Sequence, residues 1–114
     1  MIIDAHAHIG EMNRKNWTAD QLIAAMDEAA IDYSLVIAYG SSGEPSSTEK
    51  IIEACKNFDR LKVIGNVDFS TFDAQQLSNL ICHLKEKKIY GVKFYLGYDE
   101  YLAADPKLFP LYEF

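Results

Sequence analysis

Two histidines separated by a single residue, His6 and His8, lie in the N-terminal segment MIIDAHAHIG (residues 1–10). Side chains of a β-strand alternate between two faces, so Asp4, His6 and His8 are expected on one face and the apolar residues between them on the other. Buried imidazoles cost free energy unless they hydrogen-bond or bind a metal, and two of them on one strand face can hold the same divalent ion. The spacing therefore predicts a divalent metal site at His6 and His8, and places Asp4 beside it.

Helix and strand signals alternate along the rest of the chain. Thr18 and Gln21 form a capping box in front of an amphipathic stretch, and Asp73 precedes another apolar stripe at helical spacing. Residues 33–39 form a nearly continuous apolar run, as in a strand buried on both faces. The expected strands are 2–8, 33–39, 61–67 and 90–95. The expected helices are 18–30, a second one announced by Ser46 or Ser47 and ending near 57–59, and 73–88. The expected loops are 13–16, 40–47 and 97–109, after which Pro110 is expected in the first turn of a helix.

Polar residues occur in phase near the ends of the later strands. Asn66 and Asp68 share a face at the end of the third strand, and Lys93 and Tyr95 share a face of the fourth. Because the carboxyl ends of parallel strands meet at one edge of a sheet, these four residues, together with Asp4, are candidates for the wall of a substrate pocket.

The remaining candidate groups fall within helical patterns. Cys55 and Cys82 form no CxxC motif, so we expect two reduced thiols without chemistry. His83 lies beside the apolar stripe of the third helix, where we expect a partly exposed structural histidine.

The strict alternation predicts an α/β fold with a parallel sheet and right-handed crossovers. A doubly wound open sheet and the front half of a (β/α)8 barrel both satisfy this pattern. No Gly-x-Gly-x-x-Gly follows the first strand, and the polar face of that strand favours the barrel, where the carboxyl ends of the strands carry the chemistry. A whole barrel needs about 250 residues. We therefore expect residues 1–114 to form a single partial barrel domain of four parallel strands and three full helices, ending before the fifth strand.

Charge and hydropathy exclude several classes of function. The net charge of -6 argues against a surface that follows nucleic acid phosphates. No apolar run approaches the roughly 20 residues of a membrane span, and the N-terminus lacks the features of a signal peptide. We expect a cytoplasmic protein that acts on a small molecule.

Two segments carry a resemblance to a known family. The segment DAHAHIG (residues 4–10) resembles the first-strand signature of the amidohydrolase superfamily of metal-dependent (β/α)8-barrel enzymes. The segments GVKFYLGY (residues 91–98) and DPKLFPLYE (residues 105–113) are similar to the fourth-strand region of the branch that includes aminocarboxymuconate-semialdehyde decarboxylase. The resemblance implies that His6 and His8 are metal ligands and that the ion is zinc.

The same resemblance bears on Lys93. Some members of the superfamily carry a carbamylated lysine on this strand that bridges two metals. The branch that is similar here generally uses one metal, which implies that Lys93 is a substrate-binding or structural cation.

The leading hypothesis from the sequence is a fragment of a metal-dependent hydrolase, in which metal-activated water attacks a C–N or C–O bond, or of a related non-oxidative decarboxylase. The family's further histidine ligands and the aspartate that handles the water proton belong to strands beyond residue 114, so we expect no activity from the chain alone. The alternative is a non-catalytic half-barrel that assembles with another copy or with a C-terminal partner, because strands of the buried type at an open edge tend to pair. A metal-dependent nuclease of the TatD type is disfavoured by the acidic balance of the chain and by the segment around Lys93.

Overall fold

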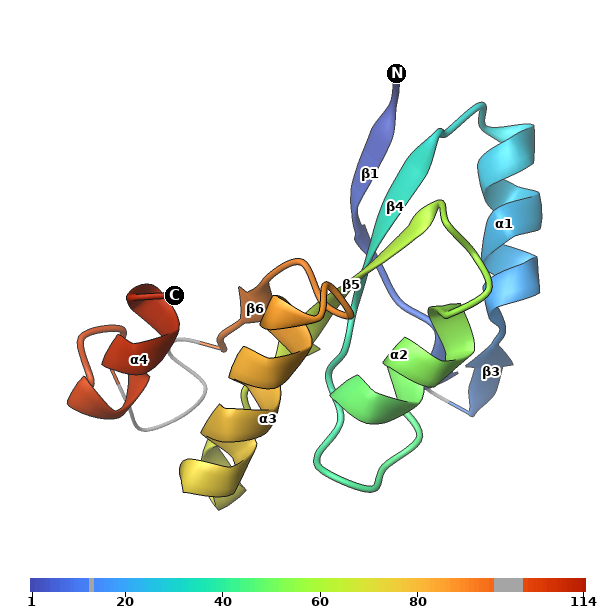
Figure 1. Cartoon of the computed structure of the whole chain (residues 1–114). Helices are drawn as coiled ribbons and strands as arrows, with labels where there is room; N and C mark the ends of the chain where they lie inside the picture. Colours follow the sequence, from blue (N-terminus) through green and yellow to red (C-terminus); the bar gives the residue numbers. More distant parts are fainter. Residues whose placement is uncertain (13, 96–101) are drawn as a thin grey trace.

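Four parallel strands follow one another across one sheet in the order of the chain (Figure 1). The computed structural model describes residues 1–12, 14–95 and 102–114. The strands are β1 (Ile3–Ala7), β4 (Tyr33–Ile37), β5 (Leu61–Asn66) and β6 (Val92–Lys93), each paired in parallel with the next. The α/β fold with four parallel strands is therefore confirmed.

Three full helices cover one face of this sheet. α1 (Ala19–Glu28), α2 (Thr48–Cys55) and α3 (Ala74–Lys85) each connect two neighbouring strands of the sheet. Their apolar side chains and those of the strands form one core cluster, which includes Ala19, Met26, Ile51, Cys55 and Leu80 from the helices and Val36, Ala38, Leu61, Val63 and Val67 from the strands and their ends. No helix among the described residues is long and apolar enough to cross a membrane.

The shorter elements lie near the C-terminus and in one connection. They are η1 (Phe69–Thr71), η2 (Pro106–Leu108) and α4 (Phe109–Tyr112). Pro110 stands in the first turn of α4, as predicted. In Figure 1, α4 lies beyond β6, at the opposite side of the fold from β1. Of the expected loop over 97–109, residues 97–101 lie outside the described residues, and η2 occupies part of the remainder.

The helix starts follow the local signals in the sequence. The Thr18 hydroxyl accepts from the Gln21 amide at 3.2 Å, and the Gln21 side chain accepts from the Thr18 amide at 2.9 Å, which confirms the capping box. The Asp73 carboxylate accepts from the Gln76 amide at 2.8 Å and caps α3. Ser47 stands at the N-cap of α2 but makes no capping hydrogen bond with its side chain.

Burial separates the two faces of the sheet. On β4 and just beyond it, Ser34, Val36 and Ala38 are all 0% exposed and face the helices. Because side chains alternate along a strand, the residues between them face the other way, which we call the inner face. The inner face comprises Tyr33, Leu35, Ile37 and Tyr39 along β4 and its end, and Lys62, Ile64, Asn66 and Asp68 along β5 and its end.

A hairpin that the sequence analysis did not predict follows β1. Strands β2 (Gly10–Met12) and β3 (Lys15–Trp17) pair antiparallel where a loop was expected. Arg14 stands in this connection with φ of 64°, a left-handed conformation that sequence rules assign to Gly, Asn or Asp. The prediction of a loop over 13–16 is therefore wrong at Lys15 and Asn16, and the left-handed position at Arg14 is held by a residue type that does not usually mark one.

Several element boundaries also differ from the prediction, including the ends of α2 at Cys55 and of α3 at Lys85. α1 ends at Glu28, because Ala30 adopts a left-handed φ of 54° and closes the helix. β6 comprises only Val92 and Lys93, so Tyr95 follows the strand instead of lying within it.

Candidate metal centre

His6 and His8 turn their ring nitrogens toward each other at the end of β1. Their Nε2 atoms lie 2.9 Å apart, and the two rings meet edge to face with centroids 4.9 Å apart. Nδ1 of His8 lies 2.8 Å from the carbonyl oxygen of Ile37 on β4. Because a carbonyl oxygen only accepts hydrogen bonds, Nδ1 of His8 carries the proton and Nε2 of the neutral ring keeps its lone pair.

The two Nε2 atoms fit a divalent metal. Zinc binds imidazole nitrogen at about 2.0–2.1 Å, so a separation of 2.9 Å corresponds to an angle of about 90° at the ion, and a tetrahedral angle needs about 3.3 Å. Histidines that bind zinc usually donate the other ring N–H to a carbonyl or carboxylate, as His8 does to Ile37. Without a metal, His6 must donate from Nε2 to His8, and its exposed ring can exchange that proton with solvent.

The pair supplies part of a coordination sphere. Among the described residues there is no group of three histidine, cysteine, aspartate or glutamate side chains placed to hold one metal ion. A catalytic zinc uses about three protein ligands and leaves a position for water. His6 and His8 therefore provide two of the protein ligands that such a site needs.

Asp4 does not share a face with the two histidines, contrary to the prediction from strict alternation. Asp4 pairs with Ser34 and Ala7 pairs with Val36, so β1 holds one extra residue between them, which is a β-bulge. Paired residues of parallel strands point to the same side, which places Asp4 on the side of the helices, with Ser34 and Val36. The Asp4 carboxylate instead accepts from the His6 amide at 3.0 Å and stabilises the bulged backbone just before the histidine pair.

The other candidate residues gather around a pocket on the inner face. Its volume is about 390 Å³, and it is lined by Tyr39, Ser41, Asn66, Val67, Asp68, Phe69 and Tyr95. The Tyr39 ring contacts the His8 ring edge to face, with centroids 5.1 Å apart, and so connects the pocket to the histidine pair. The Lys93 ammonium lies 5.4 Å from the centroid of the Tyr95 ring. The structure thus brings Asn66, Asp68 and Tyr95 together, with Lys93 at the edge of the group.

Asn66 and Asp68 differ in how their polar atoms are satisfied. Oδ1 of Asn66 is buried and has no hydrogen-bond partner among the described residues. Asp68 accepts from the amide and hydroxyl of Ser70 at 3.1 and 2.6 Å and from the hydroxyl of Thr71 at 2.9 Å. Partial burial raises the pKa of Asp68, but these hydrogen bonds, together with one from Ser41, outweigh it and hold the pKa below its ordinary value.

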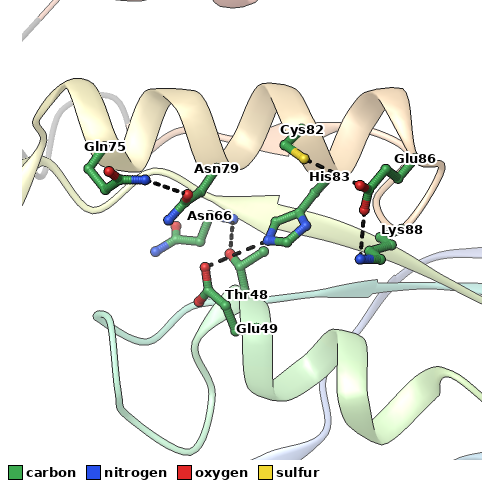
Figure 2. A network of polar contacts seen from close by, with 9 residues as sticks. All are labelled: Thr48, Glu49, Asn66, Gln75, Asn79, Cys82, His83, Glu86 and Lys88. Carbon is green, nitrogen blue, oxygen red and sulfur yellow. Dashed lines mark hydrogen bonds and ion pairs between the residues drawn. The ribbon is translucent and has the colours of Figure 1, made fainter.

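A second cavity, of about 280 Å³, opens where the first turns of α2 and α3 approach each other. Figure 2 shows the network of polar contacts beside this cavity, in which the Thr48 hydroxyl accepts a hydrogen bond from the backbone amide of Asn66 at 3.0 Å. His83 projects from α3 in the same network, with Nε2 3.8 Å from the Glu49 carboxylate. Of the candidate site residues named in the sequence analysis, only Asn66 and Asp68 line this cavity.

Sequence reasoning missed Tyr39 and the carbonyl of Ile37. A backbone acceptor has no residue-type signature, so no pattern could have revealed the Ile37 carbonyl. Tyr39 did leave a signal, because a tyrosine at the end of a buried strand, directly before Gly40, is in phase with the inner face.

Comparison with protein-family models yields no match, and comparison with curated proteins yields none either. Among solved structures, the chain is similar to the crystal structure of a probable 2-pyrone-4,6-dicarboxylic acid hydrolase from Acinetobacter baumannii with citric acid bound. The TM-score is 0.62 at 22% sequence identity, and the alignment covers 96% of this chain and 43% of that one. This chain therefore spans less than half the length of the hydrolase, and the similarity shows that it has the fold of part of a (β/α)8 barrel.

Proposed function

We propose that this chain supplies the first half of a metal-dependent hydrolase barrel and that His6 and His8 bind its divalent metal ion, which is zinc. One observation carries the proposal. The Nε2 atoms of the two histidines converge to 2.9 Å, and the Ile37 carbonyl fixes His8 in the tautomer that leaves Nε2 free to bind.

The site supports hydrolysis of a C–N or C–O bond. A zinc ion bound here would lower the pKa of a bound water and polarise a substrate carbonyl. Asn66 would border a substrate in the pocket that it lines. Lys93 would attract a substrate carboxylate toward the pocket. Among the described residues that line the pocket, Asp68 supplies the carboxylate, and four hydrogen bonds already hold it. The general base would therefore come from outside residues 1–114.

A substrate with carboxylate groups is the first choice for assay. The similar structure is that of a probable dicarboxylic acid hydrolase with citric acid bound. The same site would serve a related non-oxidative decarboxylase, since Lys93 and the metal would hold a carboxylate in either reaction. An assay with 2-pyrone-4,6-dicarboxylate distinguishes the two, because hydrolysis opens the ring and keeps both carboxylates, whereas decarboxylation releases carbon dioxide.

Completion of the barrel is a second part of the proposal. In the described residues, β1 pairs only with β4, and Ile3 on β1 is 50% exposed. An unpaired strand edge binds a further strand readily. We propose that a C-terminal half-barrel, or a second copy of the chain, covers this edge and the inner face. Light scattering tests this, and a stable monomer at tens of micromolar would contradict it.

Zinc titration tests the metal assignment without any need for activity. Isothermal calorimetry of the chain should show one weak zinc site, because each missing ligand removes a large share of the ~10–16 kcal/mol available in complete structural sites. His6→Ala and His8→Ala should abolish the site. His83→Ala is the matched control, since His83 lies on α3 and takes no part in the pair, and it should bind as the unmodified chain does. Equal zinc affinity in all four proteins would contradict the assignment.

Complementation tests the catalytic role. The chain is mixed with the C-terminal part of the Acinetobacter baumannii hydrolase, from the fifth barrel strand onward, and is assayed with zinc and 2-pyrone-4,6-dicarboxylate. Turnover that depends on His6 and His8 supports the hydrolase function. Assembly into a stable complex without turnover on any carboxylate substrate would favour the non-catalytic half-barrel.

A further inference from the structure

The Tyr39 side chain contacts the histidine pair through its aromatic ring. Its ring meets the His8 ring at an interplanar angle of 85°, with centroids 5.1 Å apart. Aromatic rings favour this edge-to-face arrangement, and the energy of the contact depends on the relative orientation of the two rings. The hydrogen bond to Ile37 fixes one point of the His8 ring, and the Tyr39 contact restricts rotation of the ring about that bond.

Tyr39 is itself held from two sides. Its hydroxyl donates to the Glu11 carbonyl at 2.7 Å, and its amide donates to the Ser46 carbonyl at 3.1 Å. Glu11 lies on β2, three residues after His8, so the hydroxyl ties the end of β4 to the segment that leaves the metal ligands. The Tyr39 ring is therefore fixed with respect to both the strand that carries His8 and the hairpin that follows it.

We infer that Tyr39 is a positioning residue that orients the His8 imidazole for metal binding and whose ring also forms part of the pocket wall. The inference rests on the proposed metal site and extends it from the ligands to the residue that aims one of them. Tyr39 lines the pocket with Asn66 and Tyr95, so a substrate in the pocket would contact the same ring that orients His8.

Three variants of the full chain separate the ring from the hydroxyl. Tyr39→Leu removes the aromatic face, and Tyr39→Phe keeps the face but removes the bond to Glu11. Tyr33→Leu is the matched control, because Tyr33 stands on the inner face at the other end of β4, beside Lys62 and away from the histidines. Circular dichroism establishes that each variant keeps its secondary structure.

Zinc affinity at fixed pH is the first measurement. Groups that orient a metal-binding histidine change metal affinity by about 10- to 100-fold when removed. Tyr39→Leu should weaken zinc binding by about tenfold, at the lower end of that range, since the Ile37 bond remains. Tyr39→Phe and Tyr33→Leu should each stay within about twofold of the unmodified chain. Unchanged affinity in Tyr39→Leu would overturn the inference.

The ring nitrogens of His8 give a second measurement that needs no metal. In ¹⁵N-labelled protein without zinc, His8 should show one tautomer with the proton on Nδ1. Tyr39→Leu should broaden this signal, because the His8 ring gains freedom to rotate about its bond to Ile37, whereas Tyr39→Phe should leave the signal unchanged. If the unmodified chain fails to bind zinc, the proposed function fails, but this spectrum still decides the role of Tyr39. If Tyr39→Leu does not fold, Tyr39→Phe decides the role of the Tyr39 ring, because a changed His8 signal in that variant would show that the ring alone does not orient His8.

Discussion

Nδ1 of His8 lies 2.8 Å from the carbonyl oxygen of Ile37, so a side chain joins β1 to β4 directly after the bulge in their pairing. The two histidines of the pair therefore have unequal structural roles. His8 is half-buried and satisfies a backbone acceptor of the neighbouring strand, whereas His6 is exposed and its side chain contacts His8.

This inequality predicts different costs for removing each histidine. In zinc-free buffer, His8→Ala should lower the free energy of unfolding by about 1–2 kcal/mol, because the Ile37 carbonyl loses its partner. His6→Ala should lower it by less than about 0.5 kcal/mol, as is usual for exposed positions. Urea denaturation followed by circular dichroism measures both. Equal costs would show that the bond to Ile37 does not stabilise the fold.

The order of the strands could be predicted because each local signal agreed with the global fold. The capping box at Thr18, the cap at Asp73 and the apolar runs of β4 and β5 all lie where the sequence places them. These signals are short-range, so a single sequence contains them in full.

The bulge in β1 could not be predicted, and it changes the candidate site. The residues Asp4 to Ile9 alternate perfectly between polar and apolar, and nothing in them announces an extra residue. The extra residue appears only in the pairing with β4, which is a long-range relationship. His6 and His8 nevertheless meet through their rings, whereas Asp4 faces the helices.

The end of α1 shows a similar limit and leads to a prediction. The Ala30 amide donates to Asp27 at 3.3 Å and the Ile31 amide donates to Met26 at 2.8 Å, which is the pattern of a Schellman motif. Ala30 occupies the left-handed position that glycine normally fills, with φ of 54°. A helix that ends without glycine gives no sequence signal, which is why the predicted helix ran two residues too far.

Replacing Ala30 by glycine should therefore stabilise the chain. A left-handed alanine costs roughly 1 kcal/mol relative to glycine, and the greater freedom of glycine in the unfolded chain offsets part of this. Ala30→Gly should raise the urea midpoint by the equivalent of about 0.5 kcal/mol. Ala25→Gly, in the middle of the same helix, is the control and should lower stability by about 1 kcal/mol. A loss of stability in both variants would contradict this account of the helix end.

The two cysteines should differ in reactivity. Burial raises the pKa of the Cys55 thiol to about 12, so almost none of it is thiolate near neutral pH. Cys82 is exposed on α3, with its sulfur 3.5 Å from the Glu86 carboxylate. A disulfide reagent at pH 8 should therefore modify Cys82 rapidly and Cys55 only after unfolding. Cys82→Ser should remove the rapid phase, and a rapid phase that persists in this variant would show that Cys55 is accessible.

The pH dependence of stability should reveal the hydrogen bonds of Asp68. Its pKa is lowered in the folded chain, because the hydrogen bonds from Ser70, Thr71 and Ser41 outweigh the effect of burial. A depressed folded pKa stabilises the folded state above the unfolded pKa of about 3.9, and this contribution is lost as the pH falls through the folded value. Asp68→Asn should therefore be less stable than the unmodified chain at pH 7, because a neutral amide oxygen accepts these hydrogen bonds less strongly than a carboxylate does.

The difference between the two proteins should shrink as the pH falls below 3.9 and should vanish once Asp68 is protonated in the folded state. Urea denaturation of both proteins at pH 7, 5, 4 and 3 measures it. Asp73→Asn is the control for replacing a capping carboxylate elsewhere in the chain, since Asp73 caps α3 through the Gln76 backbone amide. A stability difference between Asp68→Asn and the unmodified chain that stayed constant down to pH 3 would show that the Ser70 and Thr71 hydrogen bonds do not favour the ionised form of Asp68.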